Sequence, residues 1–190
     1  MKLKFLLSAG ILLASVSALA SCGGTKDNHV AGSEGLVYTL SDDEDHYIFS
    51  SIGTCTDATV TVGNWYNNLP VTEFGEAPLG DGTTLKKLIV SEGITKLAFR
   101  ACRSFSVENV VLPNGIAELP MGTFVRCDKL TEITLGTGLT KFNEGGALAS
   151  TAIKKINFRG SEEEWKKIEI TNEGDLAIIA AAQVVYNFKG

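Results

Sequence analysis

The sequence predicts a β-rich solenoid, because two short apolar patterns each recur every 22 or 23 residues. The first pattern is apolar-x-x-apolar-x-apolar, and it occupies residues 85–90, 107–112, 130–135 and 153–158. The second pattern supplies a further apolar column, at Val71, Ile94, Ile116 and Leu139. Two independent columns with the same period indicate a repeat array rather than a chance similarity.

A period of this length predicts one coil of a leucine-rich repeat, since it is too short for a helix–turn–helix unit or a propeller blade. Each first pattern supplies a short strand whose apolar residues point inward. A glycine directly before the second pattern, at Gly93, Gly115 and Gly138, permits a turn with positive φ. No coil buries its core face alone, so stability depends on neighbouring coils. We therefore expect a short leucine-rich-repeat array over residues 70–160.

The N-terminus has the features of an exported lipoprotein. Lys2 and Lys4 precede an apolar run, residues 5–20, which is too short and too rich in serine and alanine for a transmembrane helix. The sequence LASC, which ends at Cys22, resembles the bacterial lipobox. The resemblance implies a lipoprotein signal peptide over residues 1–21, cleavage before Cys22 and a lipid on its thiol.

Residues 22–34 are expected to form a flexible tether between this lipid and the folded domain, beginning with two glycines. Gly23 is not the aspartate associated with inner-membrane retention, which favours the bacterial outer membrane or the cell surface. The membrane is thus an expected partner, through the lipid on Cys22.

Residues 35–69 are expected to form an N-terminal hairpin and cap. Residues 36–40 and 46–50 flank an acidic run, which predicts two strands joined by a turn. The run DDEDH, residues 42–46, offers carboxylates as ligands for Ca²⁺, but it lacks the spacing and the glycine of an EF-hand. A solvated turn is the favoured interpretation, and we assign no metal site.

Residues 161–190 are expected to form a C-terminal helix and strand cap. Ser161 and Glu164 have the spacing of a capping box, which predicts a short helix over residues 162–168 with Trp165 laid over the last coil. The apolar run 176–188 predicts a helical turn and a final strand, and it is too short to span a membrane.

The order of residues within the coils resembles the BspA-type leucine-rich repeat. The resemblance is carried by VENVVLPNGIAELPMGTFVRCDKL (residues 107–130) and by the closing segment INFRGSEEEWKKIEI (residues 156–170), and it extends over residues 35–190. Two segments, residues 75–84 and 143–151, depart from the family pattern. The resemblance implies a protein that binds surface or host matrix proteins, without naming a ligand.

A Phe-x-x-Cys motif occurs twice, at Phe99–Cys102 and Phe124–Cys127. We expect the two motifs to occupy the same position on the far wall of adjacent coils, with both phenylalanines in the core. Neighbouring coils are separated by about 4.8 Å, a distance that permits a disulfide between Cys102 and Cys127. Because both side chains should point inward in parallel, two buried thiols are the favoured interpretation and a bridge is the alternative.

Charges alternate along the second column of the repeats. The equivalent positions are Glu73, Lys96, Glu118 and Lys141. In-register stacking would place each charge between opposite charges, with a contribution of at most about 1 kcal/mol for each exposed pair. We expect this ladder to fix the register of the coils rather than to bind a partner.

The outward positions of the first-pattern strands form the candidate binding face. Its residues are Lys87, Ile89, Asn109, Val111, Glu132, Thr134, Lys155 and Asn157. An ordinary solvated sheet face is the alternative. Removal of the signal peptide deletes two lysines and no acid, which changes the net charge from −5 to −7. Nucleic acid is therefore not an expected partner.

No catalytic motif is present, so the sequence predicts no enzyme, no catalytic residues and no cofactor. The favoured function is that of a lipid-anchored recognition or adhesion module that binds a surface protein or glycan through the solenoid strand face. The alternative is an accessory lipoprotein for glycan capture or assembly at the outer membrane. Aromatic platforms would favour glycan, and the candidates are Trp65, Tyr66 and Trp165.

Overall fold

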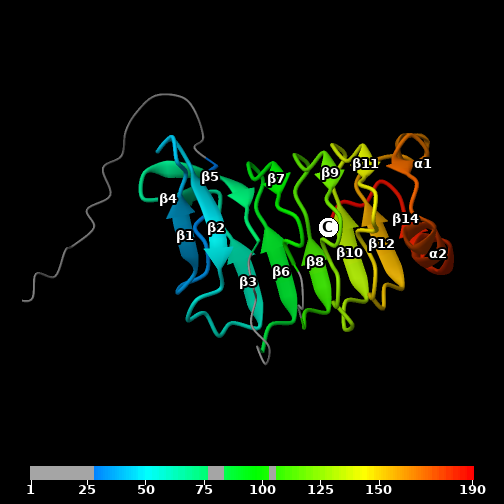
Figure 1. Ribbon diagram of the computed structural model, residues 1–190, viewed down its shortest axis with the longest axis horizontal. Coiled ribbons are helices and arrows are strands. Elements are labelled where there is room, and N and C mark those ends of the chain that lie inside the picture. The colour runs from blue at the N-terminus through cyan, green and yellow to red at the C-terminus, as the bar shows by residue number, and fades with distance from the viewer. Residues whose placement is uncertain (1–27, 77–83, 103–105) are drawn as a thin grey trace, which may run out of the picture.

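The computed structural model describes residues 28–76, 84–102 and 106–190. The expected signal peptide, the lipidation site at Cys22 and the first part of the expected tether lie outside the described residues. Figure 1 shows the strands side by side along the long axis of the molecule, with a hairpin at one end and helices at the other. Within the described residues, no helix combines the length and apolarity that a membrane crossing requires.

The main sheet has six parallel strands in the order β14-β12-β10-β8-β6-β3. These strands are β3 (Thr59–Val62), β6 (Lys87–Val90), β8 (Asn109–Val111), β10 (Glu132–Leu135), β12 (Lys155–Phe158) and β14 (Gln183–Val185). The four strands expected from the first pattern are all present and in register, which confirms the solenoid. Because side chains alternate in a strand, one row of each strand enters the core. Leu88, Val110, Ile133 and Ile156 all have no exposed surface.

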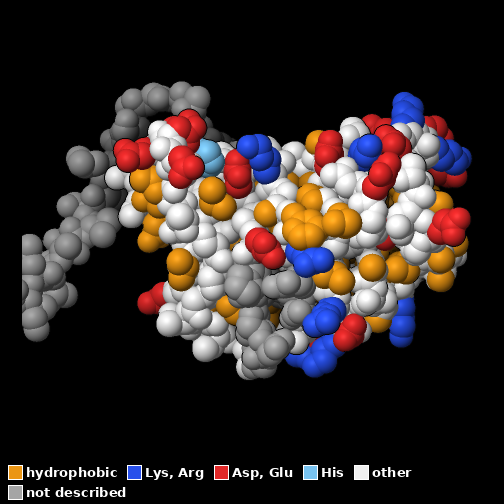
Figure 2. Space-filling view, viewed as in Figure 1, with side chains coloured by type: hydrophobic (Ala, Val, Ile, Leu, Met, Phe, Trp, Pro, Cys, Tyr) orange, Lys and Arg blue, Asp and Glu red, His pale blue; other side chains and the backbone are white. Residues whose placement is uncertain are grey.

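A second series of short strands follows the second pattern along another edge of the solenoid. It consists of β5 (Leu69–Phe74), β7 (Lys96–Leu97), β9 (Glu118–Leu119), β11 (Lys141–Phe142) and β13 (Glu169–Ile170). Glu73 lies opposite Lys96, with their side chains 2.6 Å apart. Lys141 lies between Glu118 and Glu169. The charge ladder is confirmed in register between Glu73 and Lys96 and from Glu118 through Lys141 to an additional rung, Glu169, whereas among the described strands β7 and β9 are not paired. Figure 2 shows acidic and basic side chains alternating along this edge.

Polar side chains also form a ladder at the turns that follow the main strands. The Asn64 amide donates to the Glu92 carbonyl, and the Glu92 carboxylate accepts hydrogen bonds from the backbone and side chain of Asn114. The Asn114 side-chain oxygen in turn accepts from the Thr137 N–H. These bonds satisfy backbone groups that the turns leave without strand partners.

The turn glycines have two different roles. Gly93 has φ +100°, the left-handed conformation expected for this position. The expectation of a positive φ is wrong for Gly115 and Gly138. Gly138 instead allows a close approach, because a Cβ atom there would lie 2.1 Å from the carbonyl oxygen of Asn114.

The expected equivalence of the two Phe-x-x-Cys motifs is wrong. Phe124 is 0% exposed, whereas Phe99 is 42% exposed, with the Arg100 guanidinium 4.5 Å from its ring centroid. The Cys102 N–H donates to the Thr123 carbonyl, so the first motif is displaced along the coil relative to the second. Cys102 lies eight residues after Ile94, as Phe124 lies eight residues after Ile116, so the Cys102 thiol takes the core position that the Phe124 ring holds in the next coil, and Phe99 faces outward.

Both cysteines of these motifs are nevertheless buried thiols, and they are not bridged. The Cys127 thiol donates a hydrogen bond of 3.0 Å to the Cys102 carbonyl. Burial, with a smaller effect of Cys127, raises the pKa of Cys102 well above the ordinary value for a thiol. The favoured interpretation, that both side chains are buried thiols in the core, is confirmed. Cys55 is a partly buried thiol in the N-terminal cap.

The N-terminal cap contains the expected hairpin, formed by β1 (Val37–Leu40) and β2 (Tyr47–Ser51). A second hairpin joins β4 (Trp65–Tyr66) to β5. Residues 28–34, assigned to the tether, are instead held against the first coil. Val30 exchanges hydrogen bonds with Asn64, and Ser33 does so with Thr61. Any flexible tether therefore ends before Asn28.

The C-terminal cap contains α1 (Glu162–Trp165) and α2 (Glu173–Ala181). The capping box of Ser161 and Glu164 is confirmed. Helix α1 is shorter than expected, and the Trp165 ring lies 5.3 Å from that of Phe158 in the last coil. Helix α2 replaces the expected helical turn. Its buried Asp175 accepts hydrogen bonds of 2.8 Å from the Ala147 and Leu148 N–H groups.

After β14 the chain folds back over the end of the main sheet. Asn187 has a positive φ, and the Asn187 and Phe188 N–H groups donate to the carbonyls of Gly160 and Phe158. The Phe188 ring centroid lies 5.8 Å from the Lys155 ammonium nitrogen. The C-terminal tail thus covers part of the outward face of β12.

Candidate binding surfaces

The outward row of the main sheet is open at β6 and β8. Lys87 is exposed, and Ile89, Asn109 and Val111 are partly exposed. In-register pairing places Lys87 beside Asn109 and Ile89 beside Val111. The apolar pair of Ile89 and Val111 thus lies next to the polar pair of Lys87 and Asn109 on the parallel sheet.

The same row is closed at β10 and β12, so the expectation that Thr134 and Asn157 belong to an open face is wrong. Thr134 is 2% exposed and Asn157 is 1% exposed. The Asn157 amide donates to Glu132 at 2.6 Å and approaches the Thr134 hydroxyl at 3.4 Å. The C-terminal tail lies against the β12 end of this row, through Phe188 and Lys155.

Glu132 and Lys155, the remaining two expected residues, are partly exposed but already paired. Their side chains form an ion pair of 3.0 Å. The Asn157 amide and then Lys155 lower the pKa of Glu132 below the ordinary value for a glutamate, because both stabilise its charged form. A partner would have to compete with this network, so these two residues are weaker candidates than those on β6 and β8.

Arg159, at the end of the same row, reaches across two neighbouring coils. Its guanidinium donates to the Leu112 carbonyl at 2.9 Å and lies 3.3 Å from the Glu92 carboxylate. The intervening position in the adjacent coil is Gly136, which presents no side chain in the way. This arginine is occupied by structural contacts.

The open face extends in the other direction, onto β3. Thr59 lies beside Lys87 and Thr61 beside Ile89, and both threonines have exposed surface. Thr59–Val62 does not fit the six-residue repeat pattern, and the expected binding face therefore did not include this strand. Its alternation of threonine and valine was the available signal. The candidate face, defined from here on as the β3–β6–β8 face, comprises Thr59, Thr61, Lys87, Ile89, Asn109 and Val111.

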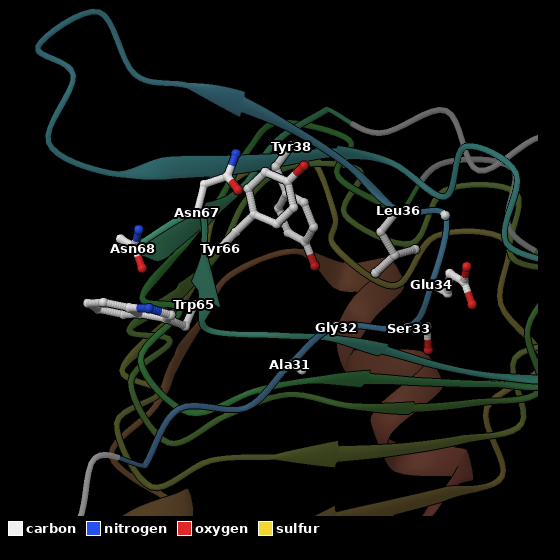
Figure 3. Close-up of a pocket in the computed structure, with 11 residues that line it drawn as sticks. Ala31, Gly32, Ser33, Glu34, Leu36, Tyr38, Trp65, Tyr66, Asn67 and Asn68 are labelled. Atoms are coloured by element: carbon white, nitrogen blue, oxygen red, sulfur yellow. The ribbon is translucent and has the colours of Figure 1, made fainter. Parts of the chain in front are cut away.

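A pocket of about 580 Å³ lies in the N-terminal cap, apart from the repeat strands. Residues 31–36 and 65–68, together with Tyr38, line it, and Figure 3 shows the aromatic residues and Asn67 and Asn68 gathered at one side. Two of the three aromatic residues named in the sequence analysis, Trp65 and Tyr66, belong to this pocket. Trp165 packs in the C-terminal cap instead.

The acidic turn between β1 and β2 brings Asp43, Asp45 and His46 together. His46 Nδ1 lies 2.5 Å from Asp45, and Nε2 lies 3.6 Å from Glu73. The hydrogen bond that the His46 ring donates to the Asp45 carboxylate raises the pKa of His46, with the charges of Glu73 and Asp43 acting in the same direction. The imidazole of His46 is therefore paired with carboxylates of the same turn, Asp43 and Asp45.

The repeats match a known protein family. A profile of the BspA type leucine rich repeat region matches residues 68–172, in six copies. The expected array, residues 70–160, lies within this match. No match is found among curated proteins.

Solved structures of bacterial leucine-rich repeat proteins are similar to this chain. A leucine-rich repeat protein from Bacteroides ovatus has 13% identity and a TM-score of 0.52, over 80% of this chain and 36% of that one. A leucine rich cell surface protein from Faecalibacterium prausnitzii has 18% identity and a TM-score of 0.45, over 77% and 43%. This chain thus spans less than half the length of either protein, and the likeness to the first supports the fold alone.

Proposed function

Because this chain belongs to the BspA-type leucine-rich repeat family, we propose that it is a surface recognition module that binds a protein through the β3–β6–β8 face. The family is one of binding modules, and we infer that this chain is likewise not an enzyme. The observation that carries the proposal is the division of the outward row. One half is closed by the tail and by paired side chains, and the other half leaves Lys87, Ile89 and Val111 open.

The composition of the open half suits a weak protein contact. Two adjacent apolar residues supply surface that gains free energy when buried, and Lys87 with the threonines supplies a polar rim. A face of three strands is small compared with a standard protein interface, in which each partner contributes about 800 Å². Several copies on one cell would compensate for weak single contacts through multivalency.

We expect substitutions on the β3–β6–β8 face to abolish capture of a protein ligand. The full chain would be probed against immobilised matrix proteins and bacterial surface proteins. The double variant Lys87→Glu, Val111→Asp should bind at least about tenfold more weakly, because it reverses one charge and buries another in the contact. Surface plasmon resonance would measure the change.

The matched control is Lys167→Glu, which makes the same charge reversal at an exposed position near α1. It should bind as the unaltered chain does. Lys155→Glu should have an intermediate effect at most, because Lys155 is paired with Glu132. Equal binding by the double variant and the unaltered chain would refute the assignment to this face.

We further propose that the protein is exported and held at the outer membrane or cell surface by a lipid on Cys22. The support is the charged, apolar and small-residue order of the first 22 residues. Metabolic labelling with a fatty-acid analogue should mark the unaltered chain and leave Cys22→Ser unlabelled, because serine offers no thiol for the thioether. Cys55→Ser is the control and should remain labelled. Persistent labelling of Cys22→Ser would exclude lipidation at this cysteine.

A further inference from the structure

The pocket of the N-terminal cap has the size of a small-ligand site. Its volume of about 580 Å³ falls inside the range of about 300–1,000 Å³ that such sites occupy. One side is formed by residues 31–36, which the hydrogen bonds of Val30 and Ser33 hold against the first coil. The other side is the hairpin between β4 and β5. Both sides are thus fixed by contacts outside the pocket.

The aromatic rings of the pocket are held in place by stacking. Trp65 stacks on His29 with ring centroids 3.8 Å apart and planes 11° from parallel, so one face of the indole is covered. Tyr66 stacks on Tyr38 at 4.6 Å and meets Tyr47 edge-on at 5.0 Å. In Figure 3 the indole is seen edge-on, with Asn68 and the tyrosine rings on one side of its plane. The rings therefore require little ordering when a ligand binds.

Uncommitted polar groups lie beside these rings. Asn67 and Asn68 have φ of 45° and 65°, the geometry of a two-residue turn between β4 and β5, and both are exposed. Across the part of the chain that the structure describes, their side-chain amides and the Glu34 carboxylate have no hydrogen-bond partner. Two amides offer donors and acceptors together, and the carboxylate adds a strong acceptor.

The charge of the residues that line the pocket disfavours an anionic ligand. Glu34 is the charged residue of the lining, and no lysine or arginine is among the residues that line the pocket. A phosphate, a sulfate or an acidic sugar would face this carboxylate without a cation to pair with. A flat aromatic face beside amides and a carboxylate fits a ligand that has an apolar C–H face and several hydroxyl groups.

We propose that this pocket binds neutral pyranose units of a glycan. The sugar ring stacks on the Trp65 indole, the amides of Asn67 and Asn68 exchange hydrogen bonds with its hydroxyls, and Glu34 accepts from a hydroxyl. The pocket adjoins the β3–β6–β8 face where Ser33 of its lining bonds to Thr61, but the two sites share no residue, so that each can be altered without substituting the other. The competing explanation is that Asn67 and Asn68 serve the turn alone.

The test uses the full chain, solubilised in a detergent without a sugar headgroup. A panel of neutral hexasaccharides, namely maltohexaose, cellohexaose, xylohexaose, mannohexaose and chitohexaose, would be screened by isothermal titration. The background variant Trp165→Phe leaves Trp65 as the single tryptophan, so its fluorescence reports on the pocket. At least one hexasaccharide should bind and change the Trp65 emission. Failure of all five to bind would overturn the proposal.

Three variants assign the binding to the pocket. Trp65→Ala should weaken it at least about tenfold, by loss of the stacking surface. Asn68→Gly gives Asn-Gly, which is favoured in this turn, so it removes one amide without strain. It should weaken binding several-fold with an unchanged melting temperature. Glu34→Gln should permit binding of sialylated or phosphorylated glycans that the unaltered chain rejects.

Other results would contradict the assignment. Unchanged affinity in both Trp65→Ala and Asn68→Gly would exclude the pocket and leave the asparagines as turn residues. Stronger binding of acidic than of neutral glycans by the unaltered chain would also refute it. The double variant Lys87→Glu, Val111→Asp should retain full glycan affinity, and a loss there would move glycan binding to the sheet face. Failure of protein capture leaves these outcomes unaffected.

Discussion

Replacing Phe124 with alanine should lower the free energy of unfolding by about 3–5 kcal/mol, the range typical of a fully buried phenylalanine. Its ring has no exposed surface and lies in the wall opposite the main sheet. The neighbouring Cys102, Cys127 and Leu148 are equally buried, so the cavity cannot fill with water at low cost. Urea denaturation of the full chain, followed by circular dichroism, measures the loss as a shift of the midpoint.

Phe99→Ala is the matched control, because it makes the same change in the other Phe-x-x-Cys motif. Phe99 is 42% exposed and its ring lies against the Arg100 guanidinium, so the expected loss is within about 1 kcal/mol. The two variants separate a core position from a surface position that has the same local sequence. Equal losses would show that the two motifs are equivalent after all.

Replacing Asp175 with alanine should destabilise the C-terminal cap by about 3–5 kcal/mol. The carboxylate accepts two backbone hydrogen bonds of 2.8 Å, from Ala147 and Leu148, and is itself fully buried. Hydrogen bonds to a charged group contribute about 1.5–3 kcal/mol each, and the variant leaves two buried N–H groups without an acceptor. Hydrogen exchange of those two amides, together with urea denaturation, measures the effect.

Two further variants distinguish loss of these bonds from a general effect on α2. Asp175→Asn keeps one acceptor oxygen and places an amide near an N–H group, so it should be destabilising but less so than alanine. Glu173→Ala changes an exposed acidic residue of the same helix and should cost within about 0.5 kcal/mol. A cost for Asp175→Ala no larger than that for Glu173→Ala would contradict the role of the carboxylate.

The architecture was predictable because the core positions repeat. Leu88, Val110, Ile133 and Ile156 lie in one buried row, as the first pattern requires. The charge ladder was predictable for the same reason, since a fixed period places equivalent residues beside one another. The capping box followed from local chemistry that depends on four consecutive residues.

The failures share a different cause, which is contact between segments that no local pattern connects. Phe99 faces outward because Cys102 holds the core position that Phe124 holds in the next coil, an offset that a motif of four residues does not record. Thr134 and Asn157 alternate correctly in their strands, yet they are buried in a network with Glu132, and the C-terminal tail lies against the same end of the sheet. Asp175 carries no local signal of its role, because the two N–H groups that donate to its carboxylate lie 27 and 28 residues earlier in the chain.

The sequence predicted the aromatic residues of the pocket but not the segment that faces them. Trp65 and Tyr66 are adjacent in the sequence and stood out as candidate platforms. Their partners Glu34 and Tyr38 come from the segment before and within the first hairpin, about 30 residues earlier. Pairing of β1, β2, β5 and β4 brings Tyr38 to Tyr66, and the hydrogen bonds of Val30 and Ser33 hold residues 31–36 at the pocket, although residues 28–34 were expected to be a flexible tether.

Arg159 has a consequence for the order in which the chain acquires its structure. Hydrogen bonds between neighbouring coils join residues about one repeat apart, such as the 23 residues between Lys155 and Glu132. The arginine instead bonds to residues 47 and 67 positions away, on coils that must already be stacked. Loop closure over such separations is slow compared with pairing of adjacent repeats. Arg159 is therefore a late contact, which forms when the array is complete and then resists its fraying from the C-terminal end.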